Sequence, residues 1–193
     1  MDLILAALLG FVCGSIPFGL ILTKAAGLGD VREIGSGSIG ATNVLRTGNK
    51  GLAIGTVLLD ALKGVVPVLL ARQFLPGTEG VAAVAAVAGH CFTPWLKFKG
   101  GKGFATAAGV LGALAWPAML VCAAIWAVTV FLSRISSVSS LTTVVLAPAV
   151  SWALGYPVWV LPLIAIAVIV IVQHRANIGR LMRGEEPRIG GKK

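Results

Sequence analysis

Apolar residues are gathered into seven stretches along this chain, and that pattern constrains the fold more than any other feature. A bilayer crossing takes about 20 mainly apolar residues in a helix, and somewhat fewer inside a bundle. The stretches cover residues 3–22, 52–74, 81–96, 104–115, 118–132, 138–154 and 158–172. With 57% hydrophobic and only 12% charged residues, the 193-residue chain cannot hide them in a soluble core. The sequence predicts an all-α polytopic integral membrane protein with seven transmembrane helices in one domain, residues 1–193.

The basic residues set the predicted orientation. With the N-terminus outside and the C-terminus cytoplasmic, 14 of the 16 Lys and Arg residues lie on the cytoplasmic side. Of the other two, Arg72 lies outside and Lys63 lies within a predicted span. This asymmetry is what the positive-inside rule demands. Trp116 and Pro117 separate the fourth and fifth stretches, and a five-span alternative that ignores this break distributes the basic residues less well. The first stretch lacks a basic leader and a clear cleavage site, which indicates a retained span.

Two predicted cytoplasmic loops are rich in glycine and polar side chains. Residues 32–46 read REIGSGSIGATNVLR, in which hydroxyl groups, a carboxamide and a guanidinium can bind phosphate oxygens. The candidates are Ser36, Ser38, Thr42, Asn43 and Arg46. A flexible linker is the alternative, although the interleaved apolar residues indicate a loop folded onto the bundle.

Residues 89–106, GHCFTPWLKFKGGKGFAT, form the second loop, where lysines and closely approaching backbone amides can hold an anion. The proposed phosphate ligands are Lys97, Gly100, Gly101, Lys102 and Gly103. Leu96 stands where a nucleotide-binding P-loop requires glycine, so a Walker motif is excluded. The alternatives are a basic loop that touches lipid head groups and, for His90, a packing residue.

Three further groups are candidates. Asp60 and Lys63 share a face of the second predicted span, either as a structural ion pair or as part of a site. Ser137 and Ser140 begin a predicted helix, where capping and anion binding can coexist. In the tail, His174 and Asn177 are three residues apart and face the same way, on a segment that could instead anchor to anionic lipid.

Other classes of function are excluded or disfavoured. The chain has no soluble basic domain that could lie along nucleic acid. Its three aspartates, Asp2, Asp30 and Asp60, are too few for a multi-aspartate metal site, and no cofactor motif is present, so neither metal nor cofactor is expected. The His-x-x-x-x-Asp pattern of many glycerolipid acyltransferases is absent as well.

Five motifs, in order, resemble the bacterial acyl-phosphate:glycerol-3-phosphate acyltransferases of the PlsY type. They are GSIPFG at 14–19, IGSGSIGATNVLR at 34–46, LDALKG at 59–64, the loop 89–106 and HRANIGRL at 174–181. The resemblance implies a seven-helix enzyme of the bacterial inner membrane. That enzyme transfers an acyl group from acyl phosphate to the 1-hydroxyl of glycerol 3-phosphate at a cytoplasmic site. The product is lysophosphatidic acid, the first intermediate of phospholipid synthesis. Ser38 departs from the asparagine usual in the family.

The resemblance also implies residue roles. Ser36, Arg46, His174 and Asn177 match catalytic positions, Lys102 with its flanking glycines matches the glycerol-phosphate loop, and Ser137 matches a later polar position. A tail glutamate, Glu185 or Glu186, would be structural, with Glu185 taken as the supporting residue. Either the substrate's phosphate or His174 would accept the hydroxyl proton. A transporter of a small phosphorylated solute is the alternative of another class, suggested by the intramembrane Asp60 and Lys63.

Overall fold

The computed structural model describes residues 1–190, and within that range every regular element is helical. The α-helices are α1 (Asp2–Gly14), α2 (Phe18–Ala25), α3 (Ala41–Val44), α4 (Lys50–Phe74), α5 (Glu79–Cys91), α6 (Phe104–Leu114), α7 (Trp116–Ser133), α8 (Ser136–Ala153), α9 (Val160–Gln173) and α10 (Arg175–Met182). The 3₁₀ turns are η1 (Val31–Glu33), η2 (Leu45–Thr47), η3 (Pro94–Leu96) and η4 (Pro157–Trp159). The all-α class is confirmed.

The first apolar stretch is a broken helix rather than a single one. α1 ends at Gly14 and α2 starts at Phe18, because Pro17 has no N–H to donate and restricts the residue before it. The break leaves carbonyl groups without helical partners. Lys63 Nζ donates to the carbonyl of Ile16 at 2.6 Å, and Thr93 Oγ1 donates to the carbonyl of Ser15 at 2.7 Å. Two distant segments are thereby attached to the break.

The third stretch is shorter than predicted. The prediction of one helix over residues 81–96 is wrong at its C-terminal end, because α5 stops at Cys91. Thr93 is extended before Pro94, as expected of a residue that precedes proline, and the η3 turn follows. The predicted break between the fourth and fifth stretches is confirmed, since α6 ends at Leu114 and α7 begins at Trp116 with Pro117 in its first turn.

Small residues allow the helices to approach closely. A Cβ added to Gly10 or Gly14 of α1 would collide with the backbone of α5 at Ala82 or Ala86. Gly109 of α6 lies in the same way against the carbonyl of Ala61 on α4. Such small-residue contacts are typical of helix packing in membranes, where van der Waals contact replaces the hydrophobic effect.

Four segments within residues 1–190 are long and apolar enough to cross a bilayer: Asp2–Ala25, Lys50–Phe74, Trp116–Ser133 and Ser136–Ala153. A fifth is obtained if Pro157–Gln173 and Arg175–Met182, bent by 61°, are counted as one broken span. α5 and α6, with 13 and 11 residues, are shorter than a simple crossing. The predicted count of seven spans is therefore not established by helix length.

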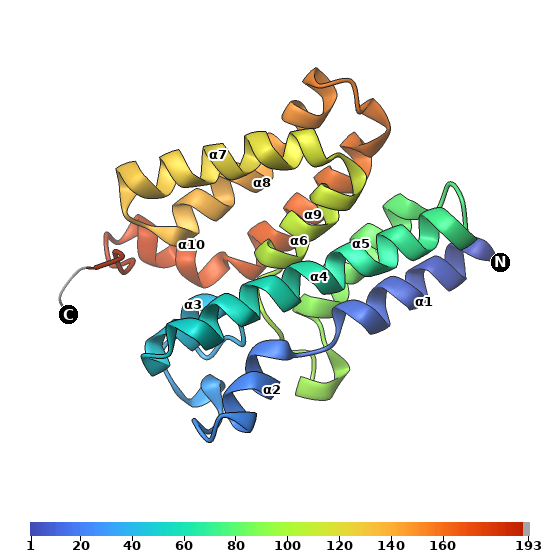
Figure 1. Ribbon diagram of the computed structural model, residues 1–193. Coiled ribbons are helices and arrows are strands. Elements are labelled where there is room, and N and C mark those ends of the chain that lie inside the picture. Colours follow the sequence, from blue (N-terminus) through green and yellow to red (C-terminus); the bar gives the residue numbers. More distant parts are fainter. Residues whose placement is uncertain (191–193) are drawn as a thin grey trace.

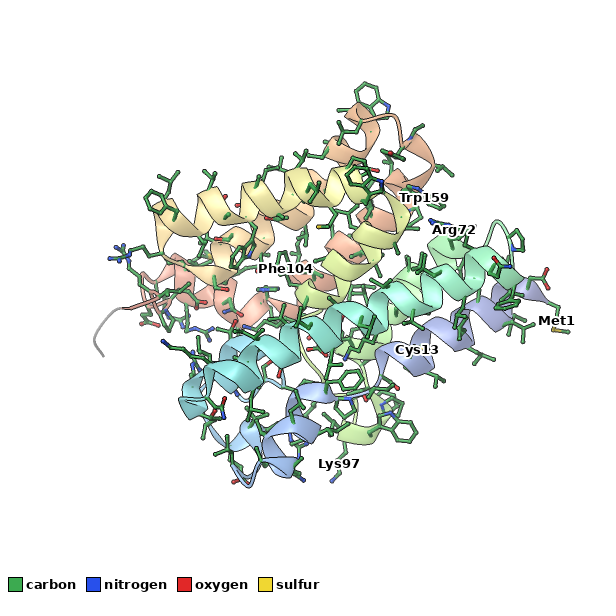
Figure 2. All side chains as sticks on the ribbon, in the orientation of Figure 1. Met1, Cys13, Arg72, Lys97, Phe104 and Trp159 are labelled. Carbon is green, nitrogen blue, oxygen red and sulfur yellow. The ribbon has the colours of Figure 1, made fainter. Side chains whose placement is uncertain are left out.

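The polar segments share one end of the bundle. Figure 1 shows α2, α3 and α10 at the end opposite the N-terminus, and the C-terminus at that same end. Arg72 lies at the other end, toward Met1 (Figure 2), where its guanidinium donates to the carbonyl of Ala113 at 2.7 Å. Lys192 and Lys193, predicted to be cytoplasmic, lie outside the described residues. The fold thus gathers the candidate site residues of the loops and tail at one end.

Candidate functional site

Asn43 organises the first polar loop. Its side chain is buried, and its Nδ2 donates to the carbonyl oxygens of Val31, Ile34 and Ser38 at 2.7, 3.1 and 2.8 Å. A buried amide that satisfies three carbonyls fixes the path of the loop. The segment is therefore a folded element and not a flexible linker.

Asn43 also brings Ser36 and Arg46 together. Its Oδ1 accepts the backbone N–H of Ser36 at 3.0 Å and Nη1 of Arg46 at 3.3 Å. Gly35 has a positive φ of 55°, and a Cβ there would overlap the Arg46 side chain. The two predicted catalytic residues of this loop thus lie side by side and exposed, with the guanidinium crossing over a glycine.

The remaining candidates of this loop have different surroundings. Thr42 is exposed on the single turn of α3. Ser38 Oγ accepts the N–H of Gly40 at 3.3 Å, a local turn contact that anchors the side chain which stands in place of the family's asparagine.

The glycine and lysine loop is folded back onto the end of α5. Gly100 donates its N–H to the carbonyl of Cys91, and Gly101 donates to the carbonyl of His90, both at 3.1 Å. A Cβ at Gly100 would collide with the His90 carbonyl, and a Cβ at Gly101 would collide with the His90 ring. These two amides are occupied and do not face a ligand, so the two glycines serve the close approach of the loop.

Lys102 follows this contact and lies in a partly buried position just before α6. Burial lowers the pKa of Lys102, and the nearby charges of Arg180 and Arg46 lower it too, against the opposing attraction of Glu186. Gly103 takes a left-handed φ of 85° and starts α6 without a side-chain cap. The first N–H groups of α6 therefore stand beside a cation, a combination suited to an anion.

Lys97 does not join Lys102. It lines a separate surface pocket of about 640 Å³ together with Lys24, Arg32, Trp95 and Lys99. Figure 2 shows Lys97 at the edge of the molecule near α2, away from Phe104 at the start of α6. Lys97 has a left-handed backbone, with φ of 53°, so the chain turns at this residue before it reaches Lys102.

Glu186 ties the tail to α8 and α10. Its carboxylate accepts from Ser137 Oγ at 2.7 Å, from Asn177 Nδ2, and from Arg180 Nε at 2.7 Å. Burial raises the pKa of Glu186, but these three hydrogen bonds outweigh burial and hold it below its usual value. Ser137 and Asn177 are thus brought together by a carboxylate that accepts hydrogen bonds from both.

Two other predicted residues lie elsewhere. Glu185 is exposed and pairs with Arg183 at 2.7 Å, so Glu186 is the tail glutamate that contacts the site. Ser140 is buried between helices and accepts from the indole N–H of Trp126 at 3.4 Å. Its hydroxyl serves the packing of α8 on α7.

His174 occupies the bend between α9 and α10. Its Nδ1 lies 2.8 Å from the carbonyl oxygen of Val170, which can only accept, so the Nδ1–H tautomer is required. Nε2 of the neutral ring then carries a lone pair. Burial lowers the pKa of His174, and the charges of Lys102 and Glu186 also act on the ring, so His174 lies near the glycine loop and the tail.

Asp60 and Lys63 lie deeper, inside the bundle. They form an ion pair of 2.7 Å, and Lys63 also binds the Ile16 carbonyl, so both have structural partners. Within residues 1–190 no three His, Cys, Asp or Glu side chains are grouped to hold a metal ion.

Sequence reasoning missed Arg180 and did not select Glu186. Arg180 is three residues after Asn177 and therefore shares its helix face, a spacing that could have found it. Glu186 lies outside any helix, and only the folded tail shows that it, and not Glu185, reaches Ser137.

Comparison with known proteins gives one consistent family. A family model described as glycerol-3-phosphate acyltransferase matches residues 4–184. Proteins named glycerol-3-phosphate acyltransferase from Erythrobacter litoralis and Mesorhizobium japonicum are 57% and 55% identical, over 100% and 98% of this chain and 98% and 97% of theirs. Two crystal structures described as PlsY (YgiH), an integral membrane glycerol 3-phosphate acyltransferase, one in its glycerol 3-phosphate form and one in its lysophosphatidic acid form, superpose with TM-scores of 0.92 and 0.91. Both are 34% identical to this chain and cover 98% of it and 96% of their own length.

Proposed function

This chain belongs to the glycerol-3-phosphate acyltransferase family, and from that premise we propose that it uses acyl phosphate as the acyl donor. The reaction yields 1-acyl-glycerol 3-phosphate, which is lysophosphatidic acid, and inorganic phosphate. One observation carries the proposal: the charges of Arg46 and Arg180 both act on Lys102, which directly precedes the uncapped start of α6. Two phosphate groups must meet in this reaction, and such a cation cluster offsets their mutual repulsion.

The residues divide into ligands of phosphate and residues that position them. Lys102 and Arg46 are the cations that approach glycerol 3-phosphate and acyl phosphate, and Ser36, next to Arg46, supplies a hydroxyl donor. Glu186 binds Ser137, Asn177 and Arg180 at once, so it fixes the wall opposite the glycine loop. Asn43 fixes the first loop in the same way, through its hydrogen bonds to residues of that loop.

The chemistry requires positioning more than a strong nucleophile, because acyl phosphate is a mixed anhydride with a good leaving group. The 1-hydroxyl oxygen of glycerol 3-phosphate attacks the acyl carbonyl carbon and forms the ester bond. The bond from that carbon to the phosphate oxygen breaks, and phosphate leaves. The hydroxyl proton passes to a phosphate oxygen in the substrate-assisted route, or to Nε2 of His174.

His174→Ala separates the two proton acceptors. In the substrate-assisted route the variant keeps measurable turnover. Abolished turnover, with glycerol 3-phosphate binding and folding intact, would assign the proton to His174 instead.

The whole chain, residues 1–193, works as one domain in the bacterial inner membrane. We place seven crossings at α1 with α2, α4, α5, α6, α7, α8 and α9, with the N-terminus outside and the C-terminus in the cytoplasm. The polar end of the bundle, which holds the site, then faces the cytoplasm, where a water-soluble glycerol 3-phosphate is available. The acyl donor reaches the same site from the bilayer.

The decisive assay offers detergent-purified protein acyl phosphate and labelled glycerol 3-phosphate, and measures labelled lysophosphatidic acid. We expect product that depends on both substrates. Absence of product, together with accumulation of labelled glycerol 3-phosphate in proteoliposomes, would favour the transporter alternative.

A further inference from the structure

A buried ionic cluster lies beneath the glycine loop and is not used by the chemistry above. Asp60 and Lys63 of α4 and His90 of α5 are each at most 4% exposed. Asp60 Oδ1 lies 2.7 Å from Lys63 Nζ and 3.7 Å from His90 Nδ1. Charges buried at such depth are costly, and they are almost always paired with one another or with backbone carbonyls.

Two of the three members have a clear task. Lys63 donates to the Ile16 carbonyl, which the break before Pro17 leaves without a helical partner, and Asp60 balances the charge of Lys63. The pair would be complete without a histidine. His90 Nδ1 has no hydrogen-bond partner within residues 1–190, and it lies 3.7 Å from Asp60 Oδ1, which is already paired with Lys63 Nζ.

The facing carboxylate selects one form of the ring. A neutral histidine carries one N–H, and Asp60 Oδ1 can only accept, so a proton on Nδ1 is favoured. At 3.7 Å the two atoms are beyond hydrogen-bond distance, but the attraction between the Nδ1–H dipole and the carboxylate favours the ring orientation with Nδ1 toward α4.

The other side of His90 contacts the loop. A Cβ on Gly101 would collide with Nε2 of the ring, and Gly101 donates its N–H to the carbonyl of the same histidine at 3.1 Å. Gly101 is therefore in close contact with His90, both through the ring and through the backbone hydrogen bond. The next residue is Lys102, so a shift of the ring moves the cation of the site.

We propose that His90 is a positioning residue, oriented by Asp60, that places the loop carrying Lys102 for glycerol 3-phosphate. This inference rests on the proposed function of Lys102. It acts through the loop, since the ring is buried beneath Gly101 with only 3% of the residue exposed. A misplacement of about 1 Å in a catalytic group can cost on the order of 100-fold in rate, so a support at this position has a measurable effect.

Two substitutions at His90 separate positioning from packing. His90→Leu fills the space without a donor, whereas His90→Asn keeps an N–H near the position of Nδ1. We expect His90→Leu to raise the KM for glycerol 3-phosphate by about 10-fold and to leave the KM for acyl phosphate within about 2-fold. His90→Asn should restore most of the loss.

Gly101→Ala tests the same contact from the loop side, because its Cβ would press on Nε2 of His90 while the Asp60, Lys63 and His90 side chains themselves stay unchanged. It should also raise the KM for glycerol 3-phosphate selectively. Both changes disturb the same contact between His90 and Gly101. The KM for glycerol 3-phosphate of the double variant should therefore be close to that of either single variant, and below the value obtained by multiplying the two single effects. If the two increases in KM multiply fully in the double variant, the proposal is overturned.

Thr78→Val is the matched control, since it removes a buried hydroxyl at the opposite end of α5, where Thr78 donates to the Leu75 carbonyl. It should lower thermal stability without a change in either KM. Binding of labelled glycerol 3-phosphate to the purified variants in nanodiscs gives a readout besides turnover. The role of His90 is overturned if the His90→Leu variant binds glycerol 3-phosphate as tightly as wild type does. It is also overturned if the substitution weakens the binding of both substrates equally. Wild-type protein that fails to bind glycerol 3-phosphate overturns the proposed function itself.

Discussion

Lys102 is the single side chain on which the proposed site depends most. It is partly buried beside Arg46 and Arg180, where a dianionic ligand gains more from a cation than it would in water. Lys102→Ala should raise the KM for glycerol 3-phosphate by about 10- to 100-fold, the equivalent of one charge-assisted hydrogen bond. Steady-state kinetics with each substrate varied in turn measures the effect.

Lys97→Ala is the control for that experiment, because Lys97 lies in a separate pocket with Lys24 and Arg32. It removes the same charge from the same loop and should leave the KM for glycerol 3-phosphate nearly unchanged. Equal effects of the two substitutions would contradict the assignment of Lys102.

The protonation of Lys102 also predicts a pH dependence. Its pKa in the free enzyme is lowered, chiefly by burial, and only the protonated form attracts phosphate. Affinity for glycerol 3-phosphate should therefore be complete below that pKa and fall as the pH rises through it, earlier than for an exposed lysine. Lys102→Arg keeps its charge, so its KM should stay flat over the same alkaline range. An identical alkaline rise in wild type and Lys102→Arg would exclude Lys102 as the cause.

Residue types in the sequence were sufficient to select candidate residues, but not to predict the contacts of those residues. The motif spacing pointed to Ser36, Arg46 and Lys102, which the fold gathers at one end of the bundle. It could not show that the chain makes a left-handed turn at Lys97 and that this side chain lines a separate pocket. Nor could it show that the N–H groups of Gly100 and Gly101 donate to carbonyls at the end of α5. Those outcomes depend on tertiary contacts that no local pattern encodes.

At the scale of the helices, hydropathy predicted the elements well and their ends less well. All seven apolar stretches contain helix, because a backbone in a bilayer has few other ways to satisfy its hydrogen bonds. The break at Pro17 and the end of α5 at Cys91 were missed, since apolar residues continue past both points. Proline marks each of these ends, at Pro17 and at Pro94, and was the available signal.

Helix packing gives a prediction with a built-in control on α6. Gly109 lies against the Ala61 carbonyl, whereas the nearest atom to a Cβ at Gly112 is the flexible Met119 side chain at 3.7 Å. Gly109→Ala should destabilise the protein by about 1–3 kcal/mol through overpacking. Gly112→Ala should be neutral or stabilising by up to about 1 kcal/mol, because alanine favours a helix. Thermal unfolding in detergent measures both, and similar loss in the two variants would contradict the α4–α6 contact.

At the scale of the whole molecule, the position of the loops predicts the orientation in the membrane. α4 starts at the polar end, directly after Asn49, and the turn between α4 and α5, which contains Pro76, lies at the opposite end near the N-terminus (Figure 1). In whole cells, a membrane-impermeant thiol reagent should label Pro76→Cys and should label Asn49→Cys only after permeabilisation. The reverse pattern would place the site outside the cytoplasm.

The most direct test of the central claim is the identity of the acyl donor. Purified protein is given labelled glycerol 3-phosphate with acyl phosphate, acyl-coenzyme A or acyl-carrier protein in separate reactions, and lysophosphatidic acid and released phosphate are both quantified. The proposed mechanism predicts product from acyl phosphate alone, with one phosphate released for each lysophosphatidic acid formed. Product from a thioester donor at a comparable rate, or phosphate release without acylated product, would contradict it.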